Sequence, residues 1–116
     1  MYIHITARHF KAHKTLRAYG FEAINKLERF YDSIVSADLI LSYEKATHSV
    51  KIAELHVKVS RSVLKALEKS DDYPKSIDAA VEKMERQLQK YKAKQREKQK
   101  AVIRKKKEET KEDEEG

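Results

Sequence analysis

The sequence predicts an α+β fold with the element order β-α-β-β-β-α, in which a four-stranded sheet carries two helices packed on one face. Two segments, residues 13–31 and 71–94, repeat apolar residues every three or four positions, which is the helical period. Four shorter segments alternate apolar and polar residues, as half-buried strands do. Because each helix has a single apolar stripe to bury, we expect both helices to lie side by side on the same face of the sheet.

The first strand is expected at residues 2–7, where Ile3 and Ile5 share one face. The following helix, at residues 13–31, is expected to bury one stripe, formed by Leu16, Ala23, Ile24, Leu27 and Phe30. Gly20 weakens this helix by about 1 kcal/mol relative to alanine. We interpret Gly20 as a point where the helix sits close to the sheet.

Three further strands are expected at residues 37–43, 50–59 and 63–68. The alternation is clearest at residues 50–59, where one face carries Ala53, Leu55, Val57 and Val59. The hydrophilic residues 45–49 link the first two of these strands. Residues 60–62 form the expected hairpin turn between the last two, although they lack the usual glycine or asparagine.

The second helix has clear start signals. Asp72 is a candidate N-cap, and Pro74 falls in the first turn, where its missing N–H costs nothing. Asp78 adds a negative charge near the positive end of the helix dipole. The apolar stripe of this helix consists of Ile77, Ala80, Val81, Met84, Leu88 and Tyr91.

The helical pattern fades after Lys94, and we therefore divide the chain into a folded domain, residues 1–94, which carries the binding surface, and a charged tail, residues 95–116. Residues 93–107 hold eight basic side chains and one acidic side chain, whereas residues 108–116 hold six acidic side chains and one lysine. The tail has little to bury, so we expect it to be disordered or a frayed helical extension.

The overall composition limits the class of protein. A chain of 116 residues predicts one domain, and its net charge of +7 and pI of about 9.5 favour a polyanionic partner. The absence of cysteine excludes disulfides and thiolate chemistry. No apolar run reaches the roughly 18–20 residues of a membrane span, and the N-terminus lacks the apolar region of a signal peptide. We expect a soluble cytoplasmic protein without a membrane partner.

Basic residues recur along both helices at helical spacing. If the helices lie side by side, these residues form a broad cationic surface that suits a phosphate backbone. The alternative is an ordinary solvated helix surface, balanced by Glu22, Glu28, Glu82 and Glu85. The basic residues are Arg17, Lys26 and Arg29 on the first helix and Lys83, Arg86, Lys90, Lys92 and Lys94 on the second.

Catalysis and metal binding are not predicted. His9 and His13 are four residues apart, but they have no nearby carboxylate and no third ligand at a matching spacing. No carboxylate pair has apolar flanks that would raise a pKa for acid catalysis, and no glycine-rich phosphate loop occurs. We therefore expect a non-enzymatic protein without a metal or cofactor.

Several segments together resemble one bacterial family, that of the ribosome hibernation-promoting factors and ribosome-associated inhibitors. The resemblance runs from about Tyr2 to Lys92, and its most specific part is SIDAAVEKMERQLQKYK in the second helix. The supporting segments, in chain order, are IHITAR, TLRAY, INKLERFYD, YEKATH and LHVKV. The family usually carries D-x-Y-x-A-I-D at the start of the second helix, whereas here Tyr73 stands one place early and Pro74 and Ser76 replace the usual residues.

The resemblance implies the same β-α-β-β-β-α fold, similar in outline to double-stranded RNA-binding domains. It also implies binding in the decoding channel of the small ribosomal subunit, where the domain blocks messenger and transfer RNA. The implied contacts with ribosomal RNA are Lys26, Arg29, Lys83, Arg86, Lys90 and Lys92, and we add Lys94 from the same basic surface. Weaker candidates are Arg17, Lys45 and His48.

The chain is similar to the short type of this family, which lacks the second, dimerising domain of long members, and we expect a monomer when free. Two other functions stay open. One is a free-standing double-stranded RNA-binding module, which messenger and initiator transfer RNA would not displace. The other is a His-dependent metalloenzyme, which would require bound metal.

Overall fold

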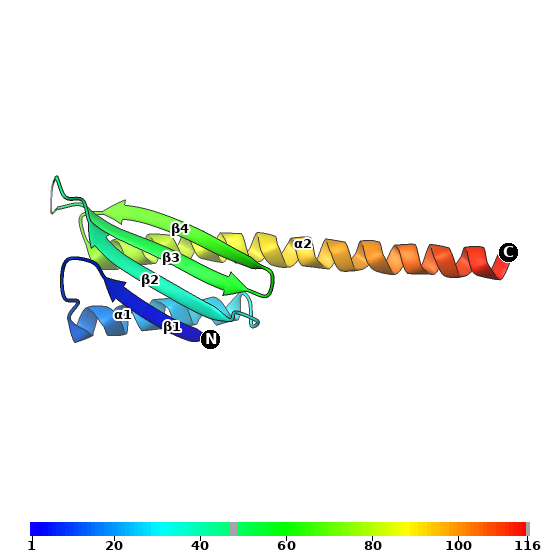
Figure 1. Ribbon diagram of the computed structural model, residues 1–116, viewed down its shortest axis with the longest axis horizontal. Coiled ribbons are helices and arrows are strands. Elements are labelled where there is room, and N and C mark those ends of the chain that lie inside the picture. The colour runs from blue at the N-terminus through cyan, green and yellow to red at the C-terminus, as the bar shows by residue number, and fades with distance from the viewer. Residues whose placement is uncertain (47–48, 116) are drawn as a thin grey trace.

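The computed structural model describes the backbone of residues 1–46 and 49–115, and side chains within this range up to residue 96. It confirms the predicted α+β fold. One four-stranded sheet is combined with two α-helices and a short 3₁₀ helix (Figure 1). In chain order the elements are β1 (Tyr2–Ala7), α1 (Lys14–Asn25), η1 (Lys26–Arg29), β2 (Ser36–Tyr43), β3 (Lys51–Val59), β4 (Ser62–Ser70) and α2 (Tyr73–Glu115).

The strands lie in the sheet in the order β1-β2-β3-β4. β1 and β2 are parallel and are joined through α1 and η1, whereas β2, β3 and β4 form antiparallel pairs. Both helices lie behind the sheet in Figure 1, so its other face carries no helix. α1 packs beside β1 and α2 packs over β3 and β4, which confirms that the helices share one face.

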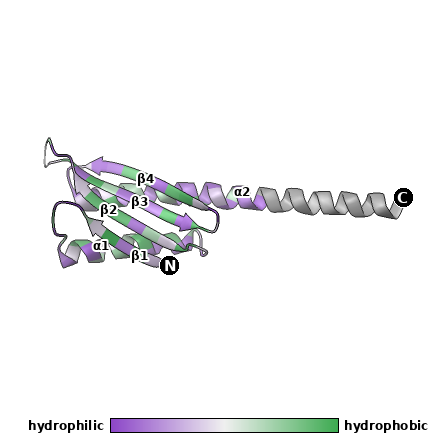
Figure 2. Ribbon diagram, in the orientation of Figure 1, coloured by the Kyte–Doolittle hydropathy of each residue, from purple (hydrophilic) through white to green (hydrophobic). Residues whose placement is uncertain are grey.

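The core lies between the sheet and the two helices. β3 alternates as predicted, and its inward residues Ala53, Leu55, Val57 and Val59 are buried. Figure 2 shows the same alternation of hydrophobic and hydrophilic residues along the strands. β2 adds Ala37, Leu39 and Leu41 to this side of the core. The helical side of the core includes Ala23, Ile24, Leu27, Ile77, Ala80, Val81, Met84 and Leu88.

The first helix differs from its predicted extent. A continuous helix was expected over residues 13–31, but α1 ends at Asn25 and one turn of 3₁₀ helix, η1, continues to Arg29. Leu27 stays fully buried in this turn, while Phe30, expected in the buried stripe, is only half-buried. The tighter winding of three residues per turn changes the direction of side chains after Asn25, so a stripe drawn with the α-helical period fails at Phe30.

The hairpin between β3 and β4 is tighter than predicted. The turn contains only Ser60 and Arg61, because Ser62 already pairs with Val59. The ladder then runs to the pair of Lys51 with Ser70, which makes β4 longer than the expected 63–68.

Gly20 lies where α1 comes closest to the sheet. A Cβ atom at this position would stand 3.0 Å from Ile5 Cδ1 and 3.1 Å from Leu39 Cδ2, closer than ordinary van der Waals contact. This confirms the interpretation of Gly20 as a close approach, and it explains a glycine inside a helix.

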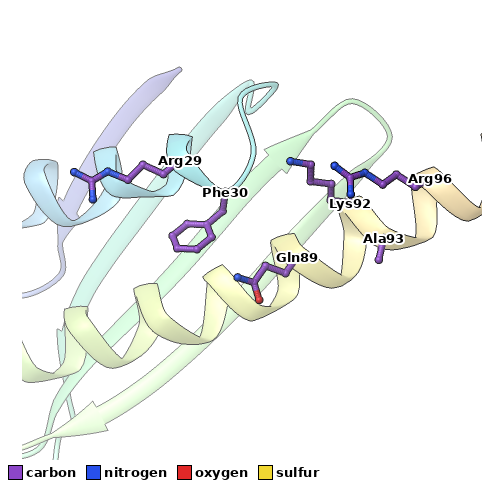
Figure 3. A pocket seen from close by; sticks show the side chains of 6 residues that line it. All are labelled: Arg29, Phe30, Gln89, Lys92, Ala93 and Arg96. Atoms are coloured by element: carbon purple, nitrogen blue, oxygen red, sulfur yellow. The ribbon is translucent and has the colours of Figure 1, made fainter.

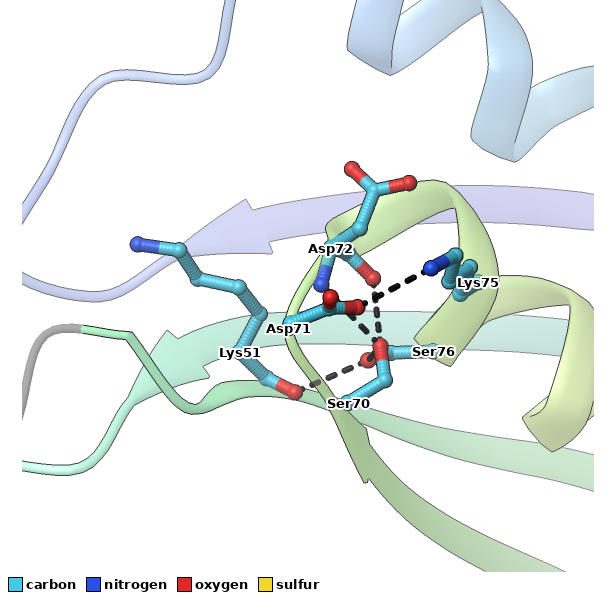
Figure 4. Close-up of polar contacts among 6 residues, drawn as sticks. All are labelled: Lys51, Ser70, Asp71, Asp72, Lys75 and Ser76. Carbon is cyan, nitrogen blue, oxygen red and sulfur yellow. Dashed lines mark hydrogen bonds and ion pairs between the residues drawn. The ribbon is translucent and has the colours of Figure 1, made fainter.

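The start of α2 is fixed by a small hydrogen-bond network (Figure 4). Asp72 precedes the first helical residue, and its carbonyl oxygen accepts a bond from the Ser76 N–H at 3.0 Å. The Ser76 hydroxyl is buried, donates to the Lys51 carbonyl oxygen at 2.8 Å and lies 2.6 Å from Ser70 Oγ. These bonds connect α2 to β3 and β4, so the helix enters over the sheet in one defined direction.

Tyr73 is also an internal anchor. Its ring stacks on Phe10 with the ring centres 5.0 Å apart and the planes 17° apart. Its hydroxyl donates to the Ser42 carbonyl oxygen at 3.0 Å. Burial, and to a lesser extent the neighbouring Tyr43, raises the pKa of Tyr73. The early position of this tyrosine therefore serves packing between the loop after β1, the end of β2 and the start of α2.

α2 does not end with the sheet. It continues without interruption to Glu115, and the molecule measures 70 × 25 × 18 Å (Figure 1). The helix therefore projects well beyond the sheet as a rod. The division of the chain at residue 94 stays a prediction.

We predict that Gly20→Val destabilises the protein by about 1–3 kcal/mol, because the added carbons overpack the contact with Ile5 and Leu39. The matched control is Ala18→Val, at an exposed position of the same helix, which should cost only the difference in helix propensity, about 0.5 kcal/mol. Urea denaturation of both variants measures the difference. Equal stability of the two would contradict the close approach at Gly20.

Candidate nucleic-acid interface

Two side-chain contacts hold α2 beside the first helical segment, one from the middle of α1 and one from just after η1. Near the start of α2, the Tyr19 hydroxyl lies 2.7 Å from both carboxylate oxygens of Asp78. After η1, the ring of Tyr31 meets the ring of Tyr91 edge to face, with the centres 5.6 Å apart. These contacts fix the spacing of the helices, so their solvent-facing sides form adjoining surfaces.

The Tyr19–Asp78 contact favours the neutral tyrosine. The hydrogen bond to Asp78 is the largest cause of a raised Tyr19 pKa, and partial burial and the negative charge of Asp78 add to it. Asp78 was predicted to interact with the helix dipole, and the structure gives it this second role between the helices.

All seven of the stronger candidate cations are exposed. Lys26 and Arg29 lie one turn apart on η1, so both stand on the same side of that 3₁₀ helix. The other candidates lie on the exposed arc of α2 and are Lys83, Arg86, Lys90, Lys92 and Lys94.

The structure divides the cations of α2 between its two flanks. Lys83 leans toward the edge of the sheet, where its Nζ atom lies 3.7 Å from Glu68 Oε1 of β4. Lys90 is seven residues further on, two helical turns, and Lys94 is one turn beyond that, so both belong to the same flank. These three lysines therefore do not meet the cations of η1.

The other flank of α2 does meet η1. Arg29 and Phe30 from the end of η1 line a recess together with Gln89, Lys92, Ala93 and Arg96 of α2 (Figure 3). Arg96 was not among the predicted contacts, because the domain boundary was drawn at Lys94. Its spacing of four residues from Lys92 is the signal that would have found it.

Two of the predicted contacts form ion pairs within the protein. Besides Lys83 with Glu68, Arg86 Nη2 lies 3.1 Å from Glu82 Oε1, with 69% and 66% of these side chains exposed. Exposed pairs of this kind contribute about 0–1 kcal/mol, so a phosphate can replace the carboxylate at little cost. Within the described part of the chain, no ion pair involves Lys26, Arg29, Lys90, Lys92, Lys94 or Arg96.

The weaker candidates lie apart from this surface. Arg17 is half-buried, and its Nη1 atom donates to the Ile5 carbonyl oxygen at 3.1 Å, which ties α1 to the open edge of β1. Lys45 is exposed in the loop between β2 and β3. Lys45 follows the end of β2, where α2 begins, whereas Arg29 ends η1 and Lys92 lies about five turns into α2 (Figure 1). His48 falls outside the described residues.

Among the described residues, no three histidine, aspartate or glutamate side chains gather closely enough to hold a metal ion. In the same part of the chain, no helix is both long and apolar enough to cross a lipid bilayer.

Known proteins share both the sequence and the fold. Residues 3–96 match the sequence model of the family described as sigma 54 modulation protein / S30EA ribosomal protein. The chain is 35% identical over 99 residues to a ribosome hibernation promoting factor from Azotobacter vinelandii, an alignment that covers 85% of this chain and 90% of that protein.

Two solved structures are similar. A ribosomal subunit interface protein from Coxiella burnetii superposes with a TM-score of 0.73 at 30% identity, covering 80% of this chain and 99% of that one. The N-terminal domain of Protein Y from Thermus thermophilus gives a TM-score of 0.69 over 78% of this chain and 99% of that one. The second likeness, at 24% identity, concerns the fold alone.

We predict that stability falls at alkaline pH and that Tyr19→Phe makes this fall smaller. Tyrosine in the unfolded chain titrates near its ordinary pKa of about 10. Since folding raises the pKa of Tyr19, the contribution of its contact with Asp78 is complete below about pH 10 and is lost as pH rises through the folded-state pKa. Melting temperatures between about pH 8 and pH 11 measure the difference, and parallel curves for the two proteins would contradict it.

Proposed function

Since the chain belongs to the sigma 54 modulation protein / S30EA ribosomal protein family, the family of the ribosome hibernation promoting factors, we propose that it binds the decoding channel of the small ribosomal subunit and blocks messenger and transfer RNA. Membership of the family confirms the resemblance that the sequence indicates. In this proposal the protein acts in the cytoplasm as a monomer. It acts by occupying the channel and catalyses no reaction.

The feature that supports this proposal is the set of exposed cations on η1 and α2. Lys26 and Arg29 of η1 and five basic residues of α2 stand on elements that pack on the same face of the sheet. Each lysine or arginine that meets a phosphate releases condensed counterions, which makes binding strong and dependent on salt. Such contacts position a protein on RNA without reading its sequence.

A rigid support makes this surface suitable for a folded RNA. The two helices are attached to the sheet through a continuous core and to each other through Tyr19–Asp78 and Tyr31–Tyr91. The elements that carry the cations therefore keep fixed spacings. Binding to a rigid array of phosphates then costs little conformational entropy. Folded RNA is recognised largely through shape and backbone contacts of this kind.

We predict that the double variant Arg29→Glu, Lys92→Glu weakens co-sedimentation with purified small subunits at least tenfold. Each substitution replaces an attraction to phosphate with a repulsion, at two exposed residues that lack an internal ion pair in the described part of the chain. The matched control is Lys58→Glu, Lys65→Glu, which changes the net charge equally on the helix-free face of the sheet.

The control variant should bind nearly as well as the wild type, and circular dichroism should show the same thermal stability for all three proteins within a few degrees. Equal weakening by both double variants would mean that only net charge matters, and it would reject the helical surface as the binding site.

Competition separates the decoding channel from RNA binding in general. We predict that messenger RNA together with initiator transfer RNA displaces the protein from small subunits, because all of them require the same channel. A double-stranded RNA of similar length, added at the same phosphate concentration, is the control and should compete much less. Displacement by the duplex alone would favour the alternative of a free-standing duplex-binding module.

A further inference from the structure

The recess between η1 and α2 combines an aromatic ring with cations on two sides. It has a volume of about 310 Å³ and is lined by Arg29, Phe30, Gln89, Lys92, Ala93 and Arg96. In Figure 3 the ring of Phe30 projects from the end of η1 toward α2, and the Gln89 side chain faces it. Arg29 lies to one side of the ring, and Lys92 and Arg96 extend from α2 on the other side.

Phe30 is an aromatic residue that the core does not use. It is half-buried, and the described half-buried apolar side chains that pack against the core, among them Phe10, Tyr31 and Tyr91, do not include it. Part of its ring therefore faces the recess and is available to a ligand. A planar apolar group is the natural partner of such a ring, because offset stacking adds to the burial of both surfaces.

The polar groups of the recess specify what the planar group must carry. Arg29, Lys92 and Arg96 form no ion pair among the described side chains, so an anionic ligand can pair with them. Because the cations stand on both sides of Phe30, the ligand needs negative charge on both sides of its planar part. A nucleotide within a chain has a phosphate on each side of its base, whereas a free mononucleotide has phosphate on one side only.

We propose that this recess holds one unpaired nucleotide of an RNA strand, with its base stacked on Phe30 and its two flanking phosphates on Arg29 and on Lys92 with Arg96. The Gln89 amide, which both donates and accepts hydrogen bonds, meets the edge of the base. This inference rests on the proposed function and deepens it. Part of the surface that contacts the RNA phosphate backbone is then also a site that holds one base. Unpaired bases are the part of RNA that aromatic side chains reach.

The test compares two single-stranded RNA hexamers, one with bases and one in which every base is absent. Both present the same phosphates, so a difference in affinity measures stacking. We expect the full-length protein to bind the hexamer with bases at least about fivefold more tightly, because stacking of one base on an aromatic side chain strengthens binding by this factor or more. Fluorescence anisotropy of end-labelled hexamers at low salt gives both dissociation constants.

Three variants test whether the preference for the hexamer with bases arises in the recess. Phe30→Leu should abolish it without weakening binding of the hexamer that lacks bases, whereas Phe30→Tyr should retain it. Arg96→Gln should weaken binding of both hexamers by the same factor and reduce the slope of log K against log salt by about 0.7. Thermal unfolding of each variant shows that it is folded under the conditions of the assay.

Equal affinity of the wild-type protein for the two hexamers would overturn the proposal, as would a preference that survives in Phe30→Leu. Co-sedimentation with small subunits, measured on the same preparations, keeps this outcome separate from the proposed function. A protein that binds small subunits but does not distinguish the hexamers has the cationic surface without the base site. A protein that distinguishes the hexamers but does not bind small subunits has the base site without the proposed ribosomal target.

Discussion

The burial of one face of the sheet by two helices is the constraint on which the other features depend. The inward residues of β2 and β3 form a continuous apolar surface, which α1 and α2 cover with their single apolar stripes. Once both helices lie on that face, their polar sides must point to solvent next to each other. The core thus sets the spacing of Arg29 from Lys92 and Arg96, although none of these three residues belongs to it.

Most of the fold was predictable because it depends on periodicity. Alternation placed the strands, the helical period placed α1 and α2, and the glycine at position 20 was interpretable as a close approach. The change to a 3₁₀ turn at Lys26 was not predictable, since the sequence KLER contains no helix breaker. The exposed part of Phe30 follows from that turn and was missed with it.

The candidate site was predictable as a set of residues but not as an arrangement. Helical spacing identified the cations of α2, but it could not show that Lys83 leans to Glu68 of β4 while Lys92 faces η1, because this depends on how the helix is rotated over the sheet. Arg96 was missed because the apolar stripe, on which the boundary was based, ends with Tyr91, whereas the polar recess extends one turn further. A domain boundary based on buried apolar residues therefore leaves out charged surface residues such as Arg96.

The uninterrupted course of α2 keeps the acidic end of the chain away from the recess between η1 and α2. A helix rises about 1.5 Å per residue, so the acidic residues from 108 onward begin about 18 Å beyond Arg96 along its axis. That is more than twice the screening length of about 8 Å at physiological ionic strength. While the helix stays intact, its acidic end therefore cannot neutralise the recess of its own molecule, and the recess keeps its positive charge for an external polyanion.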